Sequence, residues 1–320
     1  MPASSVTDLA SEVRDASLKF LWRQWQAIGA TVTGLGQASA IVDPEVLILT
    51  SLWMLDFEQR LADVTASWVR VNSSLLSIQR LRNLRDDFPK VVSNRLSALG
   101  AIGVEEGKDL RWASLRNRQA ADLGARDNKV RAVEVGSPSW ATLLLQLRRG
   151  LGVGVKADVL TFLIGTSGSE GDWSSVAMIA EATRYTPAAV RRVADDLAAA
   201  RFIRVPSTAD SDRGVQRMYN ADPTAWAQLL RVGVAHIGWG YWRERFLFIM
   251  DILTWIDGFS EREVGPYARD VEARELLTKH NAAFLRARVV DPIAFSGAEL
   301  GMAYLETATR ALVSWMNNNG

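Results

Sequence analysis

The sequence predicts a mainly α-helical protein with one small β-hairpin, and three observations support that fold class. Apolar residues recur at helical spacing along most of the 320-residue chain. Helix-capping residues stand before several of these apolar runs, and glycine or proline interrupts others. Two strand-like segments, at 201–205 and 215–219, are joined by a polar turn. This order predicts a helical N-terminal region, a central region that contains the hairpin, and a C-terminal helical bundle.

The N-terminal domain is expected to span residues 1–135. Residues 10–35 form an amphipathic helical pattern. Asp43 and Pro44 are suited to be the N-cap and the first residue of the next helix. The helices predicted after that one cover 58–71, 75–86 (capped by Ser73 or Ser74) and 91–99. A turn with a short strand is expected in 100–107, so the region as a whole is mainly helical.

Two stretches of this domain are rich in basic residues. The segment 110–135 is aperiodic, and it is either a solvated connector or an arm that contacts DNA phosphates. The segment 75–95 carries a second basic group, which consists of Arg80, Arg82, Arg85, Lys90 and Arg95. A solvated helix face explains this group, and a second, degenerate DNA-binding unit is the alternative. The sequence shows no internal repeat.

Composition argues against catalysis and against bound cofactors. The chain has no cysteine, and nothing in the sequence suggests a partner for either histidine. Adjacent carboxylates such as Asp86 and Asp87 point apart on a helix, unlike a catalytic pair. The glycine-rich segment 150–156 is not a phosphate-binding loop, because Val155 separates its last glycine from its lysine. We therefore expect no enzymatic activity, no metal and no cofactor.

Charge and hydrophobicity limit the location and the partners. The net charge of +1, from 37 basic and 36 acidic residues, is not the strongly basic balance of a protein that coats nucleic acid. The first twenty residues lack the apolar run of a signal peptide. The most apolar windows are about a dozen residues long, well short of the ~20 needed to span a bilayer. The expectation is a cytoplasmic protein with no membrane segment.

The C-terminal domain is expected at 223–320 and is predicted to be a four-helix unit. Its last two helices are predicted at 268–286 and 296–316. Four tryptophans lie close together in its first part, namely Trp226, Trp239, Trp242 and Trp255. At helical spacing such residues are most often core, and a ligand pocket or a dimer seam is the alternative.

The central domain, expected at 136–222, contains two helices joined by a tight turn. A short helix and a second helix at 156–164 precede this pair. Arg184 and Tyr185 form the turn, and Thr186 with Pro187 begins the second helix as its N-cap and first residue. Helical spacing directs five residues of that helix outward: Ala188, Arg191, Arg192, Asp195 and Ala199.

These residues resemble the winged helix-turn-helix superfamily of bacterial transcription regulators, in the broad style of the MarR and ArsR groups. The matching residues are AMIAEATRYTPAAVRRVADDLAAARFIRV and the return strand RGVQRMY, within 157–222. The resemblance implies binding to double-stranded DNA, with a recognition helix that begins at Thr186 and a wing that carries Arg213. The predicted DNA-binding residues are Arg184, Tyr185, Thr186, Ala188, Arg191, Arg192, Arg204, Arg213 and Arg217.

The resemblance leaves a second interpretation open. Asp195 and Asp196 lie four residues after Arg191 and Arg192, so each arginine has an expected ion-pair partner on the helix. A carboxylate on this helix also repels DNA. The alternative is therefore an adaptor whose winged helix docks a protein partner. For the regulator, the flanking helical regions are expected to form a homodimer or to sense a small-molecule effector of unknown identity.

Overall fold

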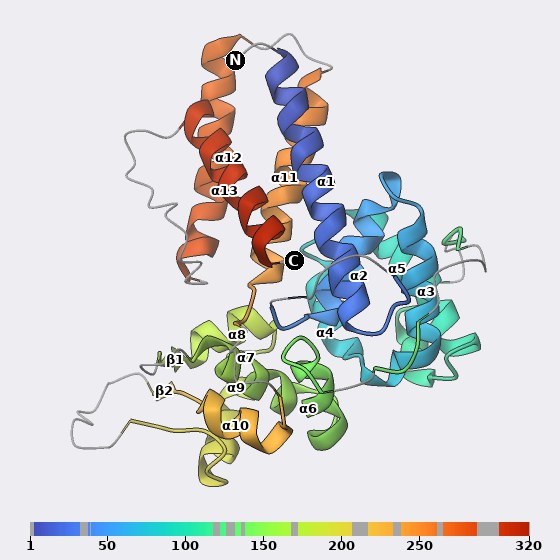
Figure 1. The fold of residues 1–320 in the computed structure, drawn as a ribbon, viewed down its shortest axis with the longest axis vertical. Helices are drawn as coiled ribbons and strands as arrows, with labels where there is room; N and C mark the ends of the chain where they lie inside the picture. The colour runs from blue at the N-terminus through green and yellow to red at the C-terminus, as the bar shows by residue number, and fades with distance from the viewer. Residues whose placement is uncertain are drawn as a thin grey trace. The chain divides into compact units, whose positions relative to one another are not determined.

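The structure is a computed structural model of the chain. It describes residues 3–32, 38, 40–117, 122–125, 132–135, 138–167, 172–206, 217–232, 238–260, 265–286 and 301–319. The described residues are mainly helical, as predicted, and their one sheet has two short strands (Figure 1).

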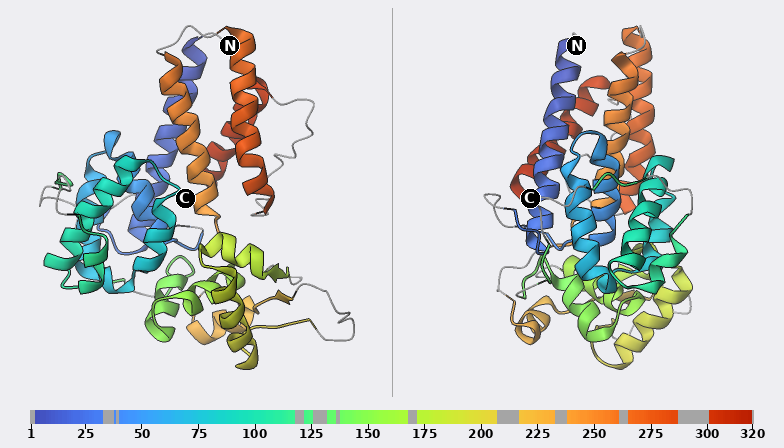
Figure 2. Two further views of the ribbon diagram at one scale, coloured as in Figure 1. Left: turned by 180° about the vertical axis from the view of Figure 1, so that it is seen from behind. Right: turned by 90° about the vertical axis from the view of Figure 1, so that its right-hand side faces the viewer.

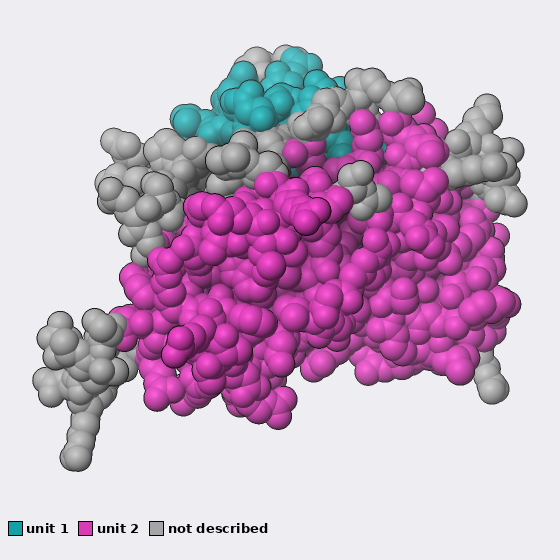
Figure 3. Space-filling model, turned by 60° about the horizontal axis from the view of Figure 1, so that its bottom comes forward, with its two compact units in different colours: residues 1–23, 241–320 teal, residues 24–240 magenta. Residues whose placement is uncertain are grey.

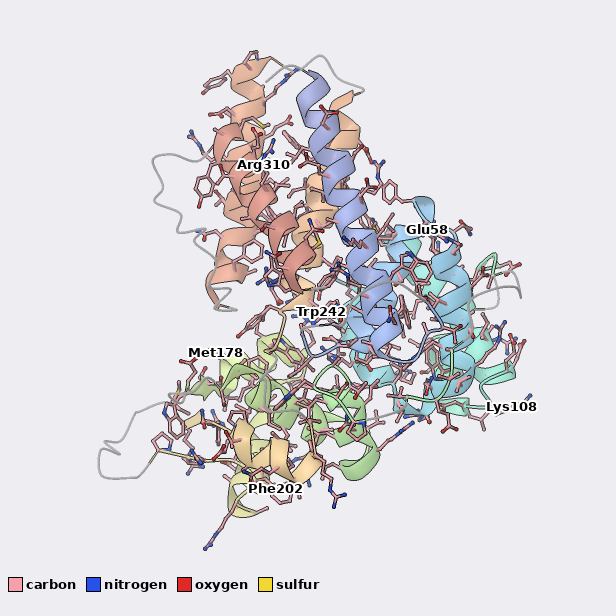
Figure 4. All side chains as sticks on the ribbon, viewed as in Figure 1. Glu58, Lys108, Met178, Phe202, Trp242 and Arg310 are labelled. Carbon is pink, nitrogen blue, oxygen red and sulfur yellow. The ribbon has the colours of Figure 1, made fainter. Side chains whose placement is uncertain are left out.

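The chain forms two compact units (Figure 3). Unit 1 combines residues 1–23 with 241–320, and unit 2 contains residues 24–240. The expected N-terminal and C-terminal domains therefore each contribute to both units, whereas the expected central domain lies within unit 2.

Unit 1 brings the N-terminal helix together with three C-terminal helices (Figures 1 and 2). These are α1 (Ala3–Ala27), α11 (Trp242–Ser260), α12 (Pro266–Arg286) and α13 (Met302–Asn319). The Phe20 ring lies 4.7 Å from the Trp242 ring and 5.2 Å from the Trp315 ring, centroid to centroid. The four described helices of this unit thus include α1, while the helix that starts at Pro223 belongs to unit 2.

The first half of unit 2 is a group of helices around α2, which is buried on all sides. Its elements are α2 (Pro44–Trp53), η1 (Met54–Asp56), α3 (Arg60–Asn72), η2 (Ser73–Leu75), α4 (Ile78–Arg85), α5 (Lys90–Glu105) and η3 (Leu110–Ser114). The predicted cap of α2 is confirmed, because Asp43 accepts a hydrogen bond from the Val46 amide at 3.2 Å.

Two local predictions in this half are wrong. The cap of α4 is Ser77, because Ser73 and its neighbours form the separate turn η2. The strand expected in 100–107 is instead the continuation of α5. A Cβ on Gly103 would lie 2.6 Å from the Trp112 ring. The glycine therefore permits close packing of a helix on an aromatic side chain and does not mark a turn.

The second half of unit 2 contains α6 (Leu143–Leu151), α7 (Val155–Thr166), β1 (Ser174–Ser175), α8 (Val176–Thr183), α9 (Pro187–Ala199), β2 (Met218–Tyr219) and α10 (Pro223–Leu230). Gly152 and Gly154 have φ values of 86° and 144°, so they form the sharp connection between α6 and α7. Helix α7 is buried along most of its length and packs against α8 and α9.

The clustered tryptophans do not form one pocket. Trp226, Trp239 and Trp242 are each buried. The three pack against different rings, those of Phe202, Phe162 and Phe20 respectively. Their distribution over two units supports a core role.

Candidate nucleic-acid interface

The turn between α8 and α9 is well defined by its caps. Helix α8 begins after Ser175, whose hydroxyl accepts from the Met178 amide, and it ends at Thr183. Arg184 adopts the left-handed conformation, with φ of 59°, and its amide donates to the Ala180 carbonyl. Thr186 then caps α9 by accepting from the Ala189 amide at 3.3 Å. These bonds turn the chain sharply and start α9 at the predicted residue.

Helix α9 has one buried face and one exposed face. Val190, Ala194 and Leu197 are buried against the rest of the unit. On the other side, Thr186, Ala188, Arg191 and Arg192 are exposed, as their spacing predicts. Within the described residues, neither arginine forms an ion pair with a carboxylate. The first two turns of α9 thus present small side chains and two exposed guanidinium groups.

The predicted pairing of the arginines with acids on α9 is not what the structure contains. The Asp195 carboxylate accepts from Arg217 Nη1 and from the Tyr219 hydroxyl, both at 2.9 Å. Arg217 directly precedes β2 and Tyr219 is its last residue, so both bind the carboxylate from outside the helix. Asp195 is thereby bound to the sheet side of the unit, which leaves Arg191 without the expected partner.

The small sheet has a pairing that the sequence did not reveal. Strand β2 pairs antiparallel with β1, Ser174 opposite Tyr219. Asn220, the residue after β2, forms an antiparallel bridge with Arg204, with amide-to-carbonyl distances of 2.6 and 3.1 Å. In the described residues, the backbone pairing of the first predicted strand is this bridge from Arg204 to Asn220, one residue beyond the predicted second strand. Arg213, predicted at the tip of the loop, lies outside them.

The other predicted site residues fall into different settings. The Arg184 side chain is 27% exposed and forms an ion pair with Asp87 at 3.0 Å. Arg204 is exposed and bound to Asp222. Tyr185 is buried, and its hydroxyl donates to Asp158 Oδ2 at 2.9 Å. The structure therefore places Tyr185 inside the unit and not on the surface of α9.

Tyr185 belongs to a buried cluster of charged side chains that was not among the predicted sites. Its charged members are Asp43, Glu45, Arg80, Arg148 and Asp158, all fully or almost fully buried. Arg148 binds Glu45 through Nη1 at 2.6 Å and Asp158 through Nε at 2.8 Å. It also donates to the Leu75 carbonyl and makes second bonds to both acids, so all five of its N–H groups are used.

Arg80 completes this buried cluster. It binds both oxygens of Asp43 and donates to Glu45 Oε2 at 2.8 Å. Burial alone would raise the pKa of Glu45, but the Arg148 and Arg80 guanidinium groups hold it below the ordinary value. The three carboxylates and two guanidinium groups satisfy one another through these bonds. Such a cluster is costly to break, because each remaining charge would be buried without a partner.

The buried cluster fixes the turn in front of α9. Arg80 Nε donates to the carbonyl of Thr183, the last residue of α8, at 3.0 Å. Asn83 donates to the carbonyl of Arg184 at 2.7 Å. The next residue, Tyr185, is bound to Asp158 and to Ser77. Three consecutive turn residues are thus held by groups about a hundred positions earlier or on α7, so the start of α9 is rigidly placed.

A signal for this cluster was present in the sequence. Arg148 follows Leu144 by four residues and Leu145 by three, which places it on the apolar face of α6. Glu45 and Asp158 each stand in the first turn of an otherwise apolar helix. A charged residue at such a position is buried only if it is paired. The partners could not be identified, because they are distant in sequence.

Other features of the described residues bear on ligands. No helix in the described ranges is long and apolar enough to cross a bilayer. The described His, Asp and Glu side chains include no group of three arranged to hold a metal ion. A pocket of about 310 Å³ lies beside α10, with Trp140, Ala227 and Arg231 in its lining. It has room for a small ligand.

Comparison of the chain with protein-family models, with curated proteins and with solved structures gave no match.

Proposed function

We propose that this chain is a sequence-specific DNA-binding transcriptional regulator that uses a winged helix-turn-helix, with α9 as its recognition helix. The observation that carries the proposal is the exposed face at the start of α9. There Arg191 and Arg192 extend from a helix whose first residues, Thr186 and Ala188, are small. Small side chains let a helix enter the major groove closely, and arginine is the commonest reader of guanine there.

The neighbouring arginines are suited to phosphate contacts. The Arg217 side chain is 68% exposed and its partner Asp195 is 41% exposed, and Arg204 has a similarly exposed partner. Exposed ion pairs contribute little to stability, so a phosphate can replace the carboxylate at small cost. DNA-binding proteins use such contacts to position the helix, while base contacts give specificity.

The buried cluster supports the same proposal, because it holds the turn that precedes α9. A recognition helix must be held in a fixed orientation to place its side chains against base edges. The bonds to Thr183, Arg184 and Tyr185 supply that rigidity. The helical unit 1 and the pocket beside α10 are the parts we assign to homodimer formation and to effector binding.

A protein-docking adaptor is the second candidate, and one observation favours it. Phe202 and Val205, just after α9, are each 42% exposed, and Asp196 is exposed on α9 itself. Exposed apolar side chains beside a carboxylate are better suited to a protein partner than to a polyanion. The two candidates differ in whether the purified chain binds DNA.

The test is a fluorescence anisotropy titration of a duplex at low salt, repeated at rising salt. We expect the wild-type chain to bind and the R191A/R192A variant to bind about tenfold more weakly. The slope of log K against log salt should decrease in magnitude by about 1–2, because two positive charges leave the interface and each neutralised phosphate contributes about 0.9. The control R274A/R310A removes two exposed arginines of unit 1 and should bind as wild type.

Two results would contradict this proposal. Absence of binding at low salt, where even non-specific association occurs, would favour the adaptor. Equal affinity of R191A/R192A and wild type would remove α9 from the interface. If binding is seen, sequencing of genomic fragments retained by the chain identifies the target sequence.

A further inference from the structure

The α4–α5 segment of unit 2 repeats the architecture of the α8–α9 segment. Each residue of the first corresponds to the residue 98 positions later, so that Ser77 matches Ser175 and Pro89 matches Pro187. Both serines cap their helices through the same bond, to the amide three residues on, at 3.2 and 3.3 Å. Helices α4 and α8 have equivalent ends, and a proline stands at the start of α5 and of α9.

The buried positions of the two segments also correspond. In α4 and α5 they are Ile78, Leu81, Leu84, Val92, Leu96 and Leu99, and the residues 98 positions later are Val176, Ile179, Ala182, Val190, Ala194 and Leu197. All twelve side chains are buried. The repeat is not evident in the sequence, because few of the matched residues are identical. The match is in position, burial and capping.

Each pair also packs against a comparable helix, although α3 stands between α2 and α4 in the chain while only β1 separates α7 from α8. Helix α2 packs against α4 and α5, and α7 packs against α8 and α9. Both are apolar helices with one buried acid in the first turn, Glu45 in α2 and Asp158 in α7. Arg148 binds both of these acids. Unit 2 therefore contains two similar three-helix arrangements, called copies below, and Arg148 links their buried acids.

The turns of the two copies touch each other. The ion pair between Arg184 and Asp87 joins the α8–α9 turn to the α4–α5 turn, and Asn83 donates to the Arg184 carbonyl from the end of α4. Helices α5 and α9 thus start from adjoining turns. Arg82, Lys90 and Asn94 of the first copy are exposed, and Arg82 directly precedes Asn83, which contacts the turn of the second copy.

We infer that the α4–α5 segment is a second DNA-contacting element, which binds backbone phosphates through Arg82 and Lys90 beside the stretch of duplex that α9 contacts. This inference rests on the proposed function of α9. The first copy is assigned to phosphates and not to base edges, because its residues that match Arg191 and Arg192 are Ser93 and Asn94, while Lys90 matches Ala188. One lysine and one arginine position a duplex without reading it.

The buried cluster holds the α4–α5 segment and α9, the two elements proposed to contact DNA, in a fixed arrangement. Because the cluster and the touching turns lock the copies together, both contacts fall at a fixed distance along the DNA. One chain then occupies a longer stretch of duplex than α9 alone could cover, with two unlike halves. Its target need not be palindromic within the stretch bound by a single chain.

The test compares three double variants of the full chain on one duplex: R82A/K90A, R191A/R192A and the control R274A/R310A. For R82A/K90A we expect about tenfold weaker binding and a salt slope smaller in magnitude by about 2, since two phosphate contacts are lost. Hydroxyl-radical footprinting should lose protection on one side of the site only. Circular dichroism and thermal melting check that each variant is folded.

The outcomes separate the two proposals. If R82A/K90A keeps the wild-type affinity, slope and footprint while R191A/R192A is impaired, this inference is wrong and α9 remains the DNA-binding element. If R82A/K90A shortens the footprint as expected and R191A/R192A is also impaired, both stand. If the wild-type chain binds no duplex at low salt, both are rejected.

Discussion

Unit 2 contains two pairs of arginines in opposite environments. Arg80 and Arg148 are almost fully buried, and each binds two carboxylates and a backbone carbonyl. Arg191 and Arg192 are exposed on α9, and the described residues offer them no ion pair. The first pair fixes the structure of the turn, and the second pair is free to bind a ligand. Residue type alone does not distinguish these roles; the helix face on which each arginine lies does.

This contrast separates stability from binding. Removal of a buried arginine leaves charged carboxylates in an apolar interior, so its main effect falls on folding. Removal of an exposed arginine changes little in the folded chain and much at a polyanionic partner. Substitutions in the two regions should therefore give opposite patterns of unfolding free energy and DNA affinity.

The largest effect is expected for Arg148→Met. Glu45 and Asp158 would lose the guanidinium group that binds both, and the free energy of unfolding should fall by about 3–5 kcal/mol. Urea denaturation at pH 7 measures the change. The matched control is Arg149→Ala. Arg149 is exposed and donates to the Val135 carbonyl, so its loss should cost no more than about 1 kcal/mol.

The pH dependence of this difference has a definite sign. The pKa of Glu45 is lowered in the folded chain, so its contribution to stability is present above the unfolded value of about 4.5 and is lost as the pH falls through the folded value. A protonated Glu45 needs no guanidinium partner. The difference in unfolding free energy between wild type and Arg148→Met should therefore become smaller below about pH 4.5. An equal gap at pH 7 and pH 4 would show that the lost packing of the side chain, and not its charge, explains the effect.

A smaller effect is expected for Tyr185→Phe. The change removes the hydroxyl that donates to Asp158 and accepts from Ser77, while the ring remains packed. A hydrogen bond to a charged group contributes about 1.5–3 kcal/mol, so the free energy of unfolding should fall by about 2 kcal/mol. The anisotropy titration should give the wild-type DNA affinity. A loss of affinity greater than the loss of folded protein would show that Tyr185 contacts DNA. The control is Tyr267→Phe, at a tyrosine that is 84% exposed, and it should change neither quantity.

Features determined by neighbouring residues could be predicted from the sequence. The caps at Asp43 and Thr186 are examples, because a capping side chain and the amide that it binds are three residues apart. The exposed face of α9 follows from helical spacing in the same way. These short-range features supplied both the helix pair and the arginines on which the functional proposal depends.

Features that depend on distant residues could not be predicted. The sequence predicted an ion pair between Asp195 and Arg191, but the Asp195 carboxylate instead binds Arg217, which lies beside the sheet. It offered no reason for α1 to join the C-terminal helices. The repeat of the α4–α5 segment in α8–α9 was also not evident from the sequence, because equivalent buried positions tolerate different apolar residues. Each case requires knowledge of which segments meet in space.

The smallest predicted effect concerns the carboxylate on the exposed face of α9. Asp196 lies four residues after Arg192 and is exposed, and a negative charge there opposes a polyanion. Asp196→Asn should raise the affinity for duplex DNA about two- to threefold at low salt. The gain should disappear as salt approaches 1 M, where the screening length is only about 3 Å. Unfolding free energy should change by no more than about 0.5 kcal/mol. Asp8→Asn, an equal change of charge on α1, is the control, and a gain of the same size there would assign the effect to net charge instead of to the position on α9. If Asp196→Asn instead weakens binding to DNA, the carboxylate orients Arg192 for the contact, and the exposed arginines would then be held by a partner as the buried ones are.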